Sequence, residues 1–93
     1  MSYEVIFSHK AYKQIQKIKK SNPQSFIQIA NVLKRAIAND NPREIGKALV
    51  GSDLWRYRAG DYRILAKIDD NKLIVETLRV AHRSEVYKNL QNL

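Results

Sequence analysis

The spacing of apolar residues changes near the middle of the chain, and this change limits the folds that the chain can adopt. Between residues 9 and 37 the apolar side chains recur every three or four positions, as on one face of a helix, with a break at residues 21–24. From residue 54 onward apolar and polar residues alternate, as in strands with one buried face. A helical first half followed by a β-rich second half predicts an α+β fold.

Turn-forming residues divide the chain into expected elements in the order β-α-α-β-β-β. These are a strand at residues 3–7, helices at 8–20 and 23–38, and strands at 54–58, 62–68 and 73–80. Residues 43–53 are predicted to be a loop, and residues 81–93 a short helix or a tail. We expect an antiparallel sheet with a two-helix hairpin on one face and a short C-terminal segment, all in a single domain over residues 1–93.

The charge balance is strongly basic, with 17 Lys and Arg residues against 9 Asp and Glu and a formal net charge of +8. A domain this basic usually meets a polyanion, so RNA, DNA, anionic lipid and an acidic protein are all candidate partners. The chain has no cysteine, 2 histidines and 3 glycines, so we expect no disulfide, no metal site and no phosphate-binding glycine loop. The expected absences argue against an NTPase and a metallonuclease.

The N-terminal residues and the lengths of the apolar runs indicate the compartment in which the protein is expected. The N-terminus has no basic stretch followed by an apolar run, and the longest apolar runs are far shorter than a membrane span. The lack of cysteine fits a reducing cytoplasm. We therefore expect a cytoplasmic protein with no signal peptide and no membrane partner.

Three arginines are predicted to gather on one face of the sheet. Side chains alternate along a strand, so Arg56 and Arg58 share a face. A two-residue loop at Gly60-Asp61 suits a type II′ hairpin, which would pair Arg58 with Arg63. Phosphate oxygens accept bidentate hydrogen bonds from arginine, so this cluster favours binding of a phosphate.

Other basic residues are harder to place. Lys13 and Lys17 lie on the polar face of the first helix, where we expect them to add attraction toward RNA phosphates, although such a face is usually only solvated. The face of Arg79 stays open, because two-residue and three-residue turns before the last strand would place it on opposite faces.

Two blocks of the sequence carry a resemblance to a known family. In the run after the last strand, a histidine, an arginine and a tyrosine lie close together: Arg79-Val80-Ala81-His82-Arg83-Ser84-Glu85-Val86-Tyr87. The other block is Trp55-Arg56-Tyr57-Arg58-Ala59-Gly60-Asp61-Tyr62-Arg63. In these blocks, and in the order of elements along the whole chain, the sequence resembles the RelE branch of the RelE/ParE toxin superfamily.

The resemblance implies a bacterial, metal-independent endoribonuclease that needs no cofactor. RelE toxins enter the ribosomal A site and cut the messenger RNA in the bound codon, which inhibits translation. The ribose 2′-hydroxyl attacks the adjacent phosphate and leaves a cyclic phosphate and a 5′-hydroxyl. A RelB-like, acidic cognate antitoxin neutralises the toxin, and the two together commonly repress their own operon at operator DNA.

The resemblance also implies which residues act. The family's catalytic basic pair falls on Arg56 and Arg58, its arginine on the next strand on Arg63, and its C-terminal arginine and tyrosine on Arg83 and Tyr87. The best-known members carry lysines in place of Arg56 and Arg58, and they space the C-terminal arginine and tyrosine further apart. Arginine is a poor general base. The group that takes the 2′-proton is therefore not assigned.

Two side chains in the C-terminal run have chemistry suited to RNA cleavage. Tyr87 would stack on a nucleobase of the RNA, or act as the general base if nearby cations lower its pKa. Its alternative role is to anchor the C-terminal segment by apolar packing. His82 is a candidate for acid–base work, and its alternative role is structural. Trp55 and Tyr57 are expected in the core rather than on a base-stacking surface.

Two other functions stay open. A ParE-like poison of DNA gyrase would share the fold, but ParE-type sequences generally lack the basic residues and the tyrosine found here. A non-catalytic module that binds nucleic acid or an antitoxin is the second alternative. For inhibition, we expect the antitoxin to cover the arginine cluster or to move Tyr87, because the positive charge there has no internal partner.

Overall fold

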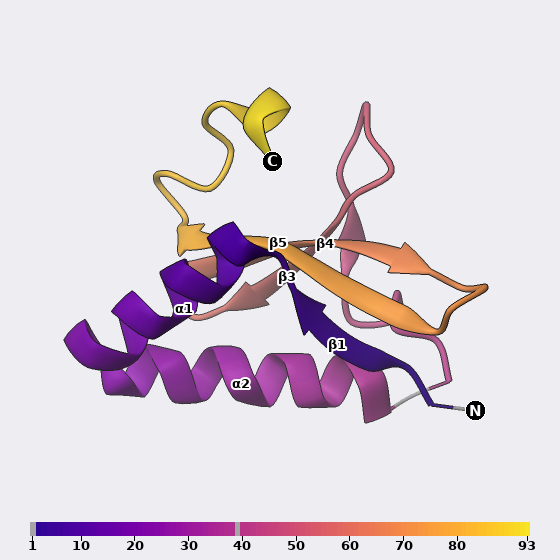
Figure 1. Ribbon diagram of the computed structural model, residues 1–93, viewed down its shortest axis with the longest axis horizontal. Coiled ribbons are helices and arrows are strands. Elements are labelled where there is room, and N and C mark those ends of the chain that lie inside the picture. Colours follow the sequence, from indigo (N-terminus) through magenta and orange to yellow (C-terminus); the bar gives the residue numbers. More distant parts are fainter. Residues whose placement is uncertain (1, 39) are drawn as a thin grey trace.

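A five-stranded sheet carries both long helices on one face, and the C-terminal segment lies on the other (Figure 1). The computed structural model describes residues 2–38 and 40–93. The elements are β1 (Glu4–Phe7), α1 (His9–Ser21), α2 (Pro23–Ala38), β2 (Lys47–Ala48), β3 (Trp55–Ala59), β4 (Tyr62–Asp69), β5 (Ile74–His82) and the 3₁₀ helix η1 (Leu90–Asn92). The strands lie in the order β1-β5-β4-β3-β2. We call the face away from the helices the open face.

The predicted α+β class and the predicted elements are confirmed, with two differences. Strand β2 forms inside residues 43–53, which were expected to be only a loop, and it pairs with β3 through two residues, too few to show an alternating pattern. Strand β1 pairs with β5 in parallel, whereas all other pairs are antiparallel. Because β1 and β5 are far apart in the chain, no local pattern indicates this pairing.

The helical hairpin follows from two capping residues. Ser8 caps α1, and its Oγ accepts a hydrogen bond from the N–H of Ala11 at 3.1 Å. Asn22 ends α1 and also caps α2, because its Oδ1 accepts from the N–H of Ser25 at 3.2 Å. Pro23 opens α2, where its missing N–H has no cost. Neither helix of the described residues is long and apolar enough to cross a membrane.

The main core lies between the sheet and the helices. Tyr57, Ile64, Val75 and Val80 point to this side and are almost completely buried. Burying such a side chain contributes about 1.5–3 kcal/mol. Ile29 from α2 belongs to the same cluster.

A β-bulge decides the orientation of the last strand. Leu65 pairs with Arg79 and Ala66 pairs with Thr77, so Leu78 is the extra residue in β5. Arg79 therefore lies on the open face, like its partner Leu65. The sequence had left the face of Arg79 undecided, because it depended on the length of the turn before β5. The N–H of Val80, beyond the bulge, donates to Oε1 of Gln14 in α1 at 2.7 Å.

Candidate functional site

The hairpin of β3 and β4 brings the three predicted arginines to the open face. Arg58 pairs with Arg63 across the hairpin as expected. Gly60 has a φ of +60°, whereas Asp61 has no positive φ, as a type II′ turn requires. Tyr57 and Ile64, the alternate residues, are buried on the helix side.

Strand β2 adds a lysine to this surface. Lys47 pairs with Arg56, so it lies on the same face. A hollow of about 400 Å³ is lined by Ile45, Lys47, Arg56, Arg58 and Arg63, with no carboxylate among them. We call it the cationic hollow. The position of Lys47 cannot be predicted from the sequence, because β2 has only two residues and so shows no alternation of apolar and polar side chains.

The C-terminal segment brings Tyr87 to the edge of the cationic hollow. Nη1 of Arg56 donates a hydrogen bond to the hydroxyl oxygen of Tyr87 at 3.0 Å, although the two residues are 31 positions apart. Val86, next to Tyr87, is fully buried and anchors the segment. Arg56, from the block at residues 55–63, and Tyr87, from the block at residues 79–87, are thus in direct contact.

Arg63 is held in place by its own hairpin. Its Nη1 donates to the carbonyl oxygens of Gly60 at 2.8 Å and Tyr62 at 3.0 Å. These bonds fix the plane of a half-buried guanidinium, and its other nitrogens make no hydrogen bond within residues 2–38 and 40–93. The guanidinium of Arg63 is therefore held in one orientation beside the hollow.

Arg83 and His82 lie at the end of β5, beside the turn of the β3–β4 hairpin. The N–H of Arg83 donates to the carbonyl of Asp61 at 2.7 Å, and its exposed Nε lies 4.0 Å from Oδ1 of the same residue. His82 pairs with Tyr62, and the two rings meet edge to face with centroids 5.8 Å apart. His82 therefore lies on the helix side of the sheet, opposite the cationic hollow.

His82 is also engaged by its neighbour Ser84. Its Nδ1 accepts from the N–H of Ser84 at 3.2 Å and lies 2.9 Å from the Ser84 Oγ. These contacts favour the tautomer with its proton on Nε2. His82 is not among the residues that line the cationic hollow.

Lys13 and Lys17 are exposed on α1, and α1 packs on the face of the sheet opposite the cationic hollow (Figure 1). A second hollow on this side, about 240 Å³, lies between the helices and is lined mainly by apolar residues, among them Phe7, Tyr12 and Phe26. Within the described chain, no three His, Asp or Glu residues lie close enough to hold a metal ion. Charge therefore selects the cationic hollow as the candidate site for an anion.

Known proteins share this fold. A family model described as the ParE toxin of the type II toxin–antitoxin system, parDE, matches residues 5–87. No curated protein sequence matches the chain. A chain of the toxin–antitoxin complex RelBE2 from Mycobacterium tuberculosis is 30% identical with a TM-score of 0.68, and the match covers 89% of this chain and 100% of that one.

Two further solved structures extend the comparison. A mutant of Escherichia coli RelE in the free state is 25% identical with a TM-score of 0.69, over 97% of this chain and 99% of that one. The YoeB/ParE toxin from Agrobacterium tumefaciens has a TM-score of 0.74 over 85% of this chain and 96% of that one, but at 10% identity it shows the fold alone. This chain therefore belongs to the ParE toxin family of type II toxin–antitoxin systems, within the RelE/ParE superfamily.

Proposed function

We propose that this toxin is an endoribonuclease that cuts messenger RNA in the ribosomal A site and thereby inhibits translation. The observation that carries the proposal is the contact between Tyr87 and Arg56 beside a hollow whose charged lining residues are all cations. Clustered cations without a carboxylate repel one another until a polyanion binds. The resemblance to RelE supplies the ribosome as the place of action.

Arginines of the hollow would bind the scissile phosphate. Arg63 is fixed by two carbonyls and its strand neighbour Arg58 is exposed, so both can present donors with little rearrangement. Donors that are preorganised around developing negative charge lower the barrier of such a reaction. Arg83, at the end of β5, would extend this binding surface along the RNA.

The proposed reaction moves one proton onto the protein and one off it. A base takes the proton of the ribose 2′-hydroxyl, a bond forms between O2′ and phosphorus, and the bond from phosphorus to O5′ breaks. The leaving O5′ takes a proton, which leaves a cyclic phosphate and a 5′-hydroxyl. We assign proton removal to Lys47, whose amine releases its own proton more readily than a guanidinium does. Tyr87, whose oxygen accepts from Arg56, would donate to O5′.

Cleavage of a defined messenger RNA, with and without programmed ribosomes, tests the proposal by primer extension. We expect cuts only with ribosomes and only within the A-site codon. Arg58→Ala should slow cleavage and lower the dependence of binding on salt, whereas Lys34→Ala, which removes the same charge from the helix layer, should change neither. Intact RNA under both conditions, from a protein that still arrests growth, would contradict the proposal.

The match to the ParE family model favours gyrase as the alternative target. A gyrase poison would leave RNA intact and trap cleaved plasmid DNA on gyrase. A module without catalysis would do neither, and Arg58→Ala would then affect binding alone. The two assays therefore separate the three functions.

We also propose an acidic cognate antitoxin as the partner, as in the toxin–antitoxin complexes that the chain resembles. A net charge of +8 and the exposed cationic hollow support it. The antitoxin would cover the hollow or displace Tyr87, and operator DNA would be bound only by the two proteins together. A complex that leaves the hollow open and Tyr87 on Arg56 would contradict this mode of inhibition.

A further inference from the structure

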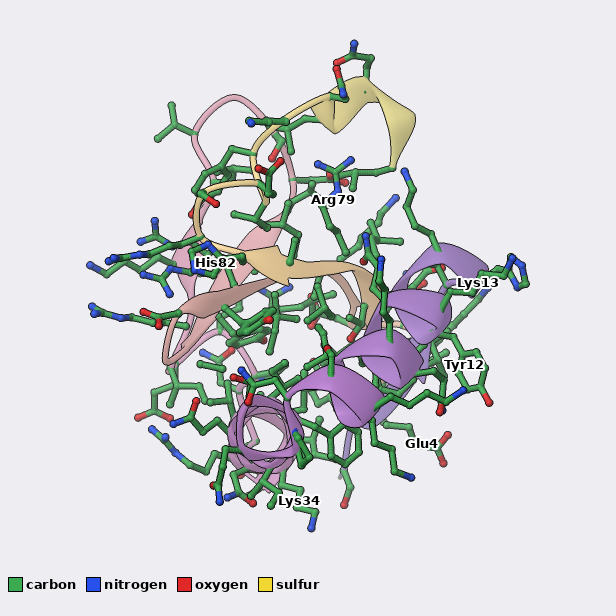
Figure 2. The ribbon with its side chains drawn as sticks, turned by 90° about the vertical axis from the view of Figure 1, so that its left-hand side faces the viewer. Glu4, Tyr12, Lys13, Lys34, Arg79 and His82 are labelled. Carbon is green, nitrogen blue, oxygen red and sulfur yellow. The ribbon has the colours of Figure 1, made fainter. Side chains whose placement is uncertain are left out.

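Arg79 is a buried guanidinium on the open face of the sheet. Its relative exposure is 5%, and it lies on β5 opposite Leu65. Figure 2 shows its side chain pointing from the sheet toward the C-terminal segment, away from the helices. A guanidinium stays charged at any ordinary pH, and a buried charge is costly unless its donors are satisfied.

The acceptors of Arg79 all come from the backbone around Tyr87. Nη1 donates to the carbonyl oxygens of Val86, at 2.9 Å, and of Lys88, and Nη2 donates to the carbonyl oxygen of Asn89 at 3.0 Å. Arg79 takes part in none of the ion pairs within the described part of the chain. Carbonyl groups on both sides of Tyr87 therefore compensate this charge.

The segment has few other anchors. After β5 it contains turns and the three-residue η1. The N–H groups of Glu85 and Val86 donate to the carbonyl of His82 and that of Lys88 to Glu85, while one backbone bond, from Arg83 to Asp61, ties the start of the segment to the β3–β4 hairpin. Val86 is buried, and Asn89 has a φ of +52°, the left-handed region that asparagine tolerates better than most residues. The three hydrogen bonds from the planar guanidinium group of Arg79 thus set the path of the backbone through Tyr87.

We propose that Arg79 is a positioning residue that holds Tyr87 against Arg56, and that it does not itself bind RNA. Arg79 does not line the cationic hollow, although it lies on the same face. Three of its N–H donors are directed to carbonyl groups, and these three cannot bind a phosphate at the same time. The catalytic consequence rests on the proposed ribonuclease function, whereas the anchoring of Tyr87 does not.

The anchoring is tested in solution with protein that carries 3-fluorotyrosine. The ¹⁹F resonance of Tyr87 is the one that Tyr87→Phe removes. We expect Arg79→Lys, which keeps the charge but replaces the fork with a single ammonium, to shift or broaden this resonance and to leave the other tyrosine resonances in place. Arg35→Met, on the exposed side of α2, should leave all of them unchanged. An unshifted Tyr87 resonance in folded Arg79→Lys protein would overturn the proposal.

The catalytic consequence is tested by a double-mutant cycle on programmed ribosomes. Arg79→Lys should lower kcat by about 10²-fold, the effect of misplacing a reacting group by roughly 1 Å, with KM and the salt dependence unchanged. In the Tyr87→Phe background it should cause no further loss. An additional loss there, or a reduced salt dependence, would show that Arg79 contacts RNA and would overturn its role as a positioning residue. If the unmodified toxin cuts no RNA, the proposed function fails, and the ¹⁹F experiment alone decides the anchoring.

Discussion

At the scale of single residues, the cations of the hollow differ in what they can do. Arg56, Arg58 and Arg63 carry planar guanidinium groups, whose fixed N–H donors match the oxygens of a phosphate. Lys47 is exposed, pairs with Arg56 across β2 and β3, and carries the only amine among the side chains that line the hollow. The arginines suit binding, and the lysine suits proton transfer.

The variant Lys47→Arg separates these two roles. It keeps the positive charge and removes the amine, so RNA affinity should change little while the cleavage rate falls by about 10²–10⁴-fold, the usual contribution of a general base. Single-turnover cleavage and RNA binding measure the two effects. Lys67→Arg, an exposed lysine on the open face outside the hollow, is the matched control. Cleavage by Lys47→Arg at the rate of the unmodified toxin would show that another group takes the proton.

At the scale of elements, the β3–β4 hairpin is positioned by its turn and by α2. Gly60 has a positive φ, and a Cβ atom there would lie 2.5 Å from Oε1 of Gln28 in α2. The turn that pairs Arg58 with Arg63 is thus also the point where the hairpin meets the helix. The positive φ favours glycine at this position, and an added Cβ would in addition force the end of the Gln28 side chain to move.

The variant Gly60→Ala should lower the free energy of unfolding by about 1–3 kcal/mol through backbone strain, and somewhat further through the contact with Gln28. Gly51→Ala is the control, since Gly51 has a φ of +84° but nothing within 4 Å of the added carbon. Urea unfolding should give the larger loss for Gly60→Ala. Adding Gln28→Ala should recover part of it, and no recovery would contradict the contact.

A second prediction at this scale concerns Thr77 in the middle of β5. Its side chain is fully buried, and its Oγ1 has no hydrogen-bond partner among the described residues. Thr77→Val removes the unsatisfied hydroxyl and keeps the shape, so it should leave the free energy of unfolding unchanged or raise it by about 1 kcal/mol. Thr77→Ala, which opens a cavity, should lower it. A clear loss of stability in Thr77→Val would indicate a partner for the hydroxyl.

At the scale of the whole molecule, one polar network joins three distant segments. Asp70, in the turn between β4 and β5, accepts two hydrogen bonds from Arg43, at 3.0 and 2.8 Å, and one from the hydroxyl of Tyr3. Arg43 also lies over the ring of Trp55, 5.8 Å from its centroid. The Arg43 guanidinium, helped by Tyr3, holds the pKa of the Asp70 carboxyl below its ordinary value.

This network predicts how stability depends on pH. A carboxyl whose pKa is lower in the folded state stabilises the fold above its ordinary pKa, near 4, and loses that contribution as the pH falls below it. Asp70→Asn should therefore lower the midpoint of urea unfolding at pH 7 and make little difference near pH 2. Asp53→Asn, which removes an exposed ion pair with Lys67, should have a smaller effect at either pH. An equal loss at both pH values for Asp70→Asn would contradict the assigned charge effect.

Interactions between residues close in the sequence predict much of the fold, and they predict the arginines of the candidate site. Helical spacing and the caps near Ser8 and Asn22 act between residues a few positions apart, so the helical hairpin could be predicted. The arginine pairing follows from alternation and a two-residue turn, which are equally local. The face of Arg79 could not be predicted, since a bulge that depends on the partner strand decides it.

The sequence by itself determined the α+β class, the paired helices and the arginines at the β3–β4 hairpin, because periodicity and turn chemistry depend only on near neighbours. Only the tertiary structure decided that Lys47 joins these arginines, that Tyr87 meets Arg56, and that His82 lies on the opposite face. These three placements depend on which distant segments pair and on how the C-terminal segment folds back. Long-range packing sets both, and no local pattern encodes them.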